Sequence, residues 1–181
     1  MRLGRKFFER DVLEVAPDLL GKVLVRRFED GREVRLMITE VEAYRGIEDQ
    51  ACHARFGKTE RNKIMWGKAG LVYVYLIYGM YWMLNLVTGK EGEPQAVLIR
   101  GLEGMEGPGR VGRLLELDRG FYGEDVIISR RLWVEEGKVK DAFLNFERSE
   151  RVGVEYAGEW ARKKWRFVVK DSKLKMQRSK L

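Results

Sequence analysis

The alternation of apolar and polar residues along the chain predicts a protein rich in β-strands, with few and short helices. Apolar positions at helical spacing in residues 9–20 predict one short helix near the N-terminus. Two runs rich in β-branched residues follow, at 22–29 and 33–44, and they flank the dipeptide Asp30-Gly31. Asp-Gly between two such runs is a strong signal for the turn of a β-hairpin. The first part of the chain is therefore predicted to fold as a helix followed by a hairpin.

Three further apolar runs, at 71–77, 81–87 and 95–103, predict neighbouring strands of one sheet. The connections between them are short and contain glycine, which favours antiparallel pairing of consecutive strands. A short helix at 111–118 and another hairpin at 132–139 are predicted after them. The chain is therefore expected to form one compact, mixed domain around a mostly antiparallel sheet.

The composition is that of an ordinary globular protein. Of 181 residues, 45% are hydrophobic and 35% are charged, a length and balance that suit a single core. No run approaches the roughly 18 apolar residues that cross a bilayer, and the N-terminus carries no secretion signal. The single cysteine, Cys52, excludes an internal disulfide and indicates a reducing, cytoplasmic location. Since the chain also has only one histidine, His53, we expect no zinc site.

The basic charge is concentrated at the C-terminal end. The formal net charge is +7, and residues 160–181 carry nine Lys or Arg against one Asp, which gives +8. The other residues hold 26 basic and 27 acidic side chains and sum to −1. Two interpretations stay open. The end faces phosphate groups, where cations gain from the release of condensed counterions, or it is a solvated tail at about residues 170–181.

A carboxylate at the end of a predicted strand is the first candidate for chemistry. Period-2 alternation predicts that one face of this strand carries Val34, Leu36, Ile38, Glu40 and Glu42. Tyr44 follows Glu42 by two residues and is expected to project the same way. Most glutamates face solvent, but a strand end that leads into a long loop is a usual place for a site. A carboxylate there can activate water and offset the positive charge that develops when a glycosidic bond breaks.

Four of the seven tyrosines lie within nine residues, at positions 73, 75, 78 and 81. Aromatic residues favour strands and fill cores, so a buried hairpin is the simplest interpretation. Tyr78, however, precedes Gly79 at the predicted hairpin tip, where a side chain is poorly placed to reach a core. An aromatic at such a tip can enter a nucleic-acid groove and replace a base that has left the stack. Tyr73 and Tyr75 share one strand face and can flank the extruded base.

Two polar residues interrupt apolar strands, Arg100 in AVLIRGL and Asn85 in MLNLV. A buried arginine needs a partner or water, so Arg100 either pairs with Glu42 and an attacking water or extends to solvent. Asn85 either donates to a base edge or satisfies backbone groups. The adjacent pair Cys52-His53 lacks the orienting third group that nucleophilic catalysis requires.

Several segments together resemble the alkyladenine (3-methyladenine) DNA glycosylases of the AAG/MPG type. The matching segments are EVEAYRGIEDQACHA, the RN of residues 61–62, LVYVYLIYGMYWMLN, AVLIRGLE, GPGR and RVGVEYAGEWARKKWRF. They span about residues 40–167, and the N-terminal FFERDVLEVAPDLLGKVLVR is also similar. The resemblance implies an α+β fold, with a single compact domain over residues 1–181, a curved, mostly antiparallel sheet, a protruding hairpin and flanking helices.

The resemblance also implies a monofunctional DNA N-glycosylase of base excision repair. Such an enzyme flips a damaged purine out of double-stranded DNA and releases it by hydrolysis. The bases expected from the resemblance are 3-methyladenine, 7-methylguanine, hypoxanthine and ethenoadenine. No metal, no cofactor and no membrane are expected, and the protein is expected to act as a monomer. In a prokaryote we expect it in the cytoplasm, associated with the nucleoid.

By motif position, the resemblance assigns roles at the reacting bond. Glu42 is similar to the general base of the family, and Arg100 and the backbone carbonyl of Val152 are expected to hold the attacking water. The residues expected to bind the flipped base are Tyr44, His53, Tyr75 and Asn85. Of these, the aromatic rings are expected to sandwich the base, and Asn85 is expected to act as a gate against normal guanine.

Contacts with the rest of the DNA are implied in the same way. Tyr78 is expected to intercalate into the gap that the flipped nucleotide leaves, with Met80 beside it. Lys58, Thr59 and Arg61 are expected to contact the DNA backbone.

Two other functions stay open from the residues alone. A non-catalytic RNA- or tRNA-binding module would also use basic residues and stacked aromatics. Glu42 argues against such a binding module, because a carboxylate that lies beside a phosphodiester contributes nothing to binding. A bifunctional glycosylase-lyase would need a lysine nucleophile, for which Lys58, Lys63 and Lys68 are available, although nothing in the sequence marks any of them as desolvated.

Removal of residues 171–181 is expected to lower DNA affinity and leave single-turnover chemistry at saturating enzyme nearly intact. This segment holds four basic residues and one acidic residue, and no catalytic candidate. If its charges meet phosphates, the slope of log affinity against log salt becomes shallower by about 0.9 per lost contact. Affinity titrations at several salt concentrations measure this slope. An unchanged slope would identify a solvated tail.

Overall fold

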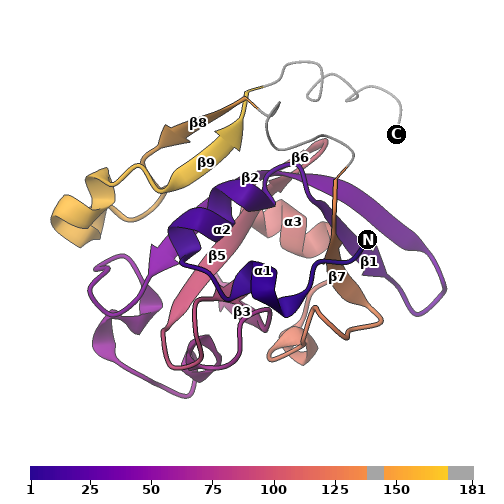
Figure 1. Ribbon diagram of the computed structural model, residues 1–181, viewed down its shortest axis with the longest axis horizontal. Helices are drawn as coiled ribbons and strands as arrows, with labels where there is room; N and C mark the ends of the chain where they lie inside the picture. The colour runs from indigo at the N-terminus through magenta and orange to yellow at the C-terminus, as the bar shows by residue number, and fades with distance from the viewer. Residues whose placement is uncertain (138–144, 171–181) are drawn as a thin grey trace.

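The computed structural model describes residues 1–137 and 145–170, which form a curved antiparallel sheet with short helices (Figure 1). The α-helices are α1 (Arg5–Phe8), α2 (Val12–Leu19) and α3 (Pro108–Leu114). The 3-10 helices are η1 (His53–Phe56), η2 (Lys63–Trp66), η3 (Arg119–Phe121) and η5 (Glu155–Arg162). The strands are β1 (Val23–Arg27), β2 (Glu33–Arg45), β3 (Val72–Ile77), β4 (Tyr81–Thr88), β5 (Gln95–Leu102), β6 (Met105–Glu106), β7 (Leu132–Glu135), β8 (Phe146–Ser149) and β9 (Arg166–Val169).

The main path of the sheet runs β3-β4-β5-β2-β1-β7, and every described pair of strands is antiparallel. The predicted hairpin around Asp30-Gly31 is β1–β2, and the three predicted neighbouring strands are β3, β4 and β5. The long strand β2 also pairs with β9, which in turn pairs with β8. In Figure 1 the β8–β9 ribbon extends away from the rest of the sheet. The predicted α+β class is confirmed.

The helix predicted over residues 9–20 is α2, which begins at Val12. The side chain of Asp11 caps it by accepting a hydrogen bond from the backbone N–H of Leu13. The apolar residues of α2 are buried in the core beneath it. A separate short helix, α1, precedes α2. The sequence pattern missed it because four residues are too few to show a helical period.

The two faces of the sheet have different surroundings. The face toward α2 and α3 is apolar and contributes Val41, Ala43, Val72, Val74, Leu84, Leu86, Val97 and Ile99 to the main core. The opposite face carries the alternate residues of the same strands, among them Glu42, Tyr44, Tyr73, Tyr75, Met83, Asn85, Leu98 and Arg100. The functional candidates of the sequence therefore lie on the face away from the helices.

The prediction that Glu40 and Glu42 continue the face of Ile38 is wrong, and the reason is a β-bulge in β2. From Ile38 to Glu40, β2 has one more residue than β5, and from Glu40 to Val41 the extra residue is in β5 instead. A bulge adds a residue to one strand and exchanges its faces. Ile38 and Val41, three residues apart, therefore both lie in the core. The bulge lets Glu40 and Glu42 leave the apolar face that a regular strand would give them.

Two expectations near the C-terminal end also change. The helix predicted at 111–118 is α3, which begins earlier because Pro108 occupies its first turn. Of the hairpin predicted at 132–139, β7 is formed, but it pairs with β1. Residues 138–139 and the tail segment 171–181 lie outside the described residues. Among the described helices, none has both the length and the apolar character needed to cross a bilayer.

Gly112 is expected to tolerate no side chain. A Cβ atom there would lie 2.0 Å from the carbonyl oxygen of Trp82, which is backbone and cannot turn away. Gly112→Ala gains about 1 kcal/mol of helix propensity, but α3 must move off β4, and such overpacking costs about 1–3 kcal/mol or more. We therefore expect a lower free energy of unfolding in denaturant titrations. Gly4→Ala is the control, because a Cβ at Gly4 meets nothing within 4 Å. Equal stability of the two variants would contradict this packing argument.

Candidate functional site

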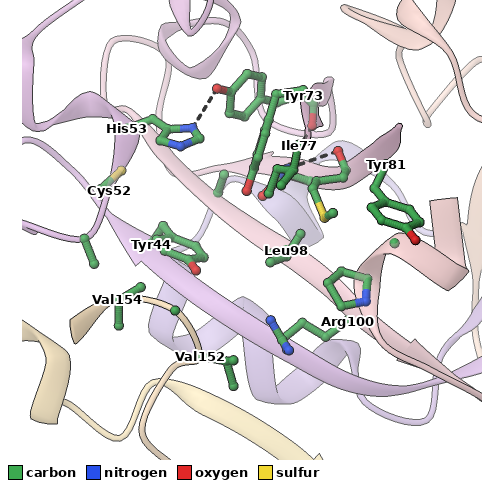
Figure 2. Close-up of a pocket in the computed structure, with 18 of the residues that line it drawn as sticks. Tyr44, Cys52, His53, Tyr73, Ile77, Tyr81, Leu98, Arg100, Val152 and Val154 are labelled. Atoms are coloured by element: carbon green, nitrogen blue, oxygen red, sulfur yellow. Dashed lines mark hydrogen bonds between the residues drawn. The ribbon is translucent and has the colours of Figure 1, made fainter. Parts of the chain in front are cut away.

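A cavity of about 580 Å³ lies over the sheet face that points away from the helices. One row of paired residues runs from the cavity into the sheet: Tyr73, Asn85 and Leu98 line the cavity, whereas Glu42 and Arg166 lie behind its lining residues. Tyr73 pairs with Asn85, Asn85 with Leu98, Leu98 with Glu42, and Glu42 with Arg166. Figure 2 shows the aromatic side chains of Tyr73 and His53 on one side of this cavity and Val152 and Val154 on the other. The site is therefore assembled from the sheet and from three further segments, at residues 51–65, 106–110 and 152–156.

Glu42 is completely buried at one end of this row, with a side-chain exposure of 0%. Its Oε2 atom accepts a hydrogen bond from the Tyr44 hydroxyl at 2.8 Å, and its Oε1 atom accepts one from the backbone N–H of Val152 at 2.8 Å. Burial raises the pKa of the Glu42 carboxyl above its ordinary value. The charge of Arg100 and these two hydrogen bonds oppose that rise. The result is an oriented carboxylate that accepts a proton more readily than an exposed glutamate does.

Arg100 is close to two carboxylates rather than one. Its Nε atom donates to Oε1 of Glu40 at 2.9 Å and lies 3.5 Å from Oε1 of Glu42. Arg166, from β9, donates to the same oxygen of Glu40 at 2.6 Å. The alternative in which Arg100 extends to solvent is therefore wrong, because the side chain is 13% exposed. Its shorter bond is to Glu40, a residue for which no role was predicted from the sequence.

The aromatic wall consists of three rings in mutual contact. His53 and Tyr75 pack edge to face with ring centroids 4.6 Å apart, and Tyr73 lies 5.3 Å from Tyr75. Nδ1 of His53 is 2.8 Å from the Tyr73 hydroxyl oxygen. Burial, with smaller contributions from Arg61 and Arg55, lowers the pKa of His53 to about 4. The imidazole is therefore neutral at neutral pH.

Tyr44 faces this wall from across the cavity (Figure 2). Because His53 and Tyr75 already touch each other, a planar ligand cannot lie between these two rings. Tyr44 lines the same cavity, so a planar ligand bound there would lie against its ring as well. Asn85 lines the cavity as well, and its amide nitrogen donates to the backbone carbonyls of Tyr73 and Met83. A cavity lined by several aromatic rings suits a flat heterocycle.

The tip of the β3–β4 hairpin is exposed, as predicted. Tyr78 is 87% exposed and Met80 is 62% exposed. Tyr78 has φ 52°, a left-handed conformation that is uncommon for a residue other than glycine, and Gly79 follows with φ 69°. This turn projects the Tyr78 ring out of the sheet at the rim of the cavity.

The loop after His53 is held by Asn62, which is 2% exposed. The Asn62 amide nitrogen donates to the backbone carbonyls of His53 and Gly57, and its oxygen accepts from the N–H of Thr59. Lys58, Thr59 and Arg61 are exposed on this loop, as a contact with a polyanion requires. Arg61 also lines the cavity, with its guanidinium carbon 5.2 Å from the centre of the Tyr75 ring.

The described residues do not support a lysine or cysteine nucleophile. Lys58, Lys63 and Lys68 are exposed, and none of them lines the cavity. Cys52 is buried, and burial raises the pKa of its thiol to about 12, so the thiol stays protonated. Among residues 1–137 and 145–170, no group of three or more His, Cys, Asp or Glu side chains could hold a metal ion.

A buried ion pair fixes the loop that carries Val152. The guanidinium of Arg151 makes two hydrogen bonds to the carboxylate of Asp49, at 2.6 and 2.8 Å, and both side chains are 0% exposed. Arg151 also donates to the carbonyl of Ala43 and stacks on the ring of Tyr44 at 4.9 Å. The Arg151 guanidinium therefore connects the loop that carries Val152, the end of β2 and the ring of Tyr44.

Sequence reasoning missed Glu40, Asp49 and Arg151 because none of them stands out as a motif. Two signals were available. Glu40 is a second acidic residue at the end of an otherwise apolar strand, and Arg151 lies inside the segment RVGV beside a predicted site residue. For Val152, the structure shows a hydrogen bond from its backbone N–H to Glu42, whereas the family resemblance implies a role for its carbonyl.

Comparison with known proteins finds related sequences along nearly the whole chain. The family model described as Methylpurine-DNA glycosylase (MPG) matches residues 6–107 and 104–173. Three relatives carry the name "Putative 3-methyladenine DNA glycosylase". The relative from Methanocella arvoryzae is 46% identical over 94% of this chain and 93% of its own length. Those from Desulfitobacterium hafniense and Legionella pneumophila (strain Corby) are 41% and 44% identical, each over 94% of this chain and 96% of its own length.

Asp49→Asn is expected to destabilise the protein by about 3–5 kcal/mol, because it leaves the buried Arg151 charge without its partner. Denaturant titration of the two proteins measures the difference. Glu60→Gln is the matched control, since it removes the carboxylate of an exposed pair with Lys63 and is expected to leave stability unchanged. A loss in Asp49→Asn no larger than in the control would show that the buried pair does not hold this loop.

Proposed function

The chain belongs to the methylpurine-DNA glycosylase (MPG) family, and from this premise we propose which bases it releases and which residues do so. As a member it is a DNA glycosylase, a hydrolase of DNA repair that acts on methylated purines. We propose that it is monofunctional and acts as a monomer on duplex DNA. Its proposed substrates are 3-methyladenine, 7-methylguanine, hypoxanthine and ethenoadenine.

The observation that carries this proposal is the buried Glu42 carboxylate beside an aromatic-lined cavity. In the proposed reaction, Arg100 and the backbone of Val152 hold a water next to Glu42. Water attacks the anomeric carbon on the face opposite the base, and Glu42 accepts its proton. The N-glycosidic bond breaks, and its electron pair leaves with the purine. The carboxylate also offsets the positive charge that develops on the sugar.

The leaving base explains why one carboxylate suffices for methylated purines. A purine alkylated at N3 or N7 carries positive charge and leaves as a neutral molecule without a proton donor. Hypoxanthine is neutral and needs a proton as it leaves. His53 does not supply it as an imidazolium, because burial lowers its pKa to about 4. We therefore expect alkylated purines to be released faster than hypoxanthine.

Base recognition in this proposal uses the cavity that Tyr44, His53 and Tyr75 line. Stacking on aromatic rings contributes about 1–3 kcal/mol per base and suits any purine. Asn85, which lines the same cavity, rejects the exocyclic amino group of guanine. Bases that pair weakly are favoured because they cost least to extrude.

The surrounding DNA is held by the exposed parts of the site. Tyr78 enters the stack at the gap left by the flipped nucleotide, and Met80 lies beside it, in keeping with their exposure at a hairpin tip. Lys58, Thr59 and Arg61 contact the phosphate backbone, which positions the duplex. A non-catalytic RNA-binding module is set aside, because the chain belongs to a family of enzymes. The lyase alternative loses support because its candidate lysines lie outside the cavity.

Glu42→Gln is expected to keep DNA binding and to lose base release by about 10²–10⁴-fold, the usual effect of removing a general base. Single-turnover assays on duplex with 7-methylguanine, without added metal, measure the rate. Released bases are identified by mass spectrometry, and parallel duplexes with hypoxanthine or ethenoadenine define the substrate range. Glu33→Gln is the control, since Glu33 lies on the same strand but at the surface. A Glu42→Gln rate equal to that of the control would refute the proposed mechanism.

A further inference from the structure

Glu40 lies at the centre of a group of four charged side chains, of which the mechanism above uses Glu42 and Arg100 but neither Glu40 nor Arg166. It is 8% exposed, and its Oε1 atom accepts hydrogen bonds from both Arg100 and Arg166. Glu42, the other acidic member, pairs across the sheet with Arg166 and lies 3.5 Å from Arg100. Two carboxylates and two guanidinium groups thus form a cluster without net charge, in which Arg166 is the most exposed member.

We propose that Glu40 is a positioning residue that holds Arg100 away from Glu42, so that Arg100 does not take the place of the attacking water at this carboxylate. This inference rests on the proposed role of Glu42 as the general base. It assigns Glu40 no contact with the substrate, because Glu40 acts through Arg100.

The distances support this division of partners. The Arg100–Glu40 separation of 2.9 Å is that of a normal hydrogen bond, whereas 3.5 Å to Glu42 is longer than charged groups adopt when they bond fully. A guanidinium beside a buried carboxylate closes this gap unless another anion restrains it, since their attraction is strong away from water. If Arg100 closed on Glu42, it would occupy the oxygen that receives the proton. The base would then be weaker and its approach blocked.

The charged groups around Glu42 support the same role for Glu40. The groups that face it are Glu40 and Tyr44 from β2, Tyr75 from β3, Arg100 from β5, Arg166 from β9, and Arg151 with the Val152 N–H from the loop before η5. Glu40 raises the pKa of Glu42, and Arg100 lowers it. Removal of the Glu40 charge therefore lowers this pKa twice, directly and by releasing Arg100. It also leaves a net positive charge where the sugar develops one.

The fold places Glu40 in this position through the β2 bulge. Opposite the bulge is Gly101, and a Cβ atom there would lie 3.0 Å from Cβ of Glu40. The close approach of the two strands brings the Glu40 side chain between Arg100 and Arg166.

Glu33 offers a matched control on the same strand. Its carboxylate also accepts hydrogen bonds from two arginines, Arg27 and Arg35, but it lies among exposed side chains outside the cavity. Glu33→Gln and Glu40→Gln therefore remove the same charge and the same kind of bonds. They differ in whether one of the released arginines faces Glu42.

The test is single-turnover release of 7-methylguanine across a pH series, with saturating parent enzyme, Glu40→Gln, Glu33→Gln and Arg166→Gln. In the parent, release falls as Glu42 becomes protonated at low pH. At neutral pH we expect Glu40→Gln to release the base about 10²-fold more slowly than the parent. We also expect its acid limb, the pH range over which the rate falls in acid, to move to lower pH. The difference in rate between Glu40→Gln and the parent therefore becomes smaller at acidic pH. Glu33→Gln should match the parent. Arg166→Gln leaves Glu40 to Arg100 alone, and its acid limb should move to higher pH.

An acid limb of Glu40→Gln at the same pH as the parent would overturn the inference, even if the rate fell, because a purely structural defect does not move the limb. If Glu40→Gln does not fold, the inference is tested by Arg166→Gln instead. An acid limb of Arg166→Gln at the same pH as the parent, or at lower pH, overturns the inference. Glu42→Gln separates this failure from failure of the proposed function. Loss of release in Glu42→Gln with an unmoved limb in Glu40→Gln refutes only the role of Glu40.

Discussion

The bulge in β2 allows one strand to serve both the core and the site. Before the bulge, Ile38 faces the core, and after it Val41 and Ala43 do so. Glu40, which precedes Val41, and Glu42, which lies between Val41 and Ala43, are on the opposite face. In a regular strand, the face of Ile38 would carry both carboxylates into the apolar core, where unpaired charge is very costly. The extra residue avoids that cost and aims both acids at arginines from the neighbouring strands.

The second requirement is a rigid connection between the sheet and the loop that follows β8. The buried pair of Arg151 with Asp49 supplies it, and Arg151 stacks on Tyr44 as well. The N–H of Val152 can then reach Glu42, although the two residues are 110 positions apart in sequence. A site that orients a water at one carboxylate needs this rigidity, since small displacements of the reacting groups lower the rate by large factors.

The exposed and buried parts of the site follow different physical rules. At the buried end of the site, Glu42 lies beside Arg100 and is oriented by two donors, and His53 is neutral. At the rim, Tyr78 and Met80 remain exposed at a hairpin tip, where a partner rather than the core can cover them. The buried part is suited to chemistry and the exposed part to contact with a large ligand. The two meet because the same hairpin strands that form the floor also carry the tip.

The sequence by itself determined that β3, β4 and β5 are neighbours, that β1 and β2 form a hairpin and that Tyr78 is exposed, because these features depend on local periodicity and turn residues. It also singled out Glu42, Tyr44 and Tyr75 as a possible site, through a motif and a shared strand face. The bulge, the short helix α1 and the pairing of β7 with β1 came only from the tertiary structure. A bulge depends on the partner strand, four residues are too few to show a period, and β7 pairs with a strand more than 100 positions away. Pairs such as Arg151 with Asp49 and Arg100 with Glu40 are likewise decided by packing, since charge patterns along a chain do not reveal which ions will be buried together.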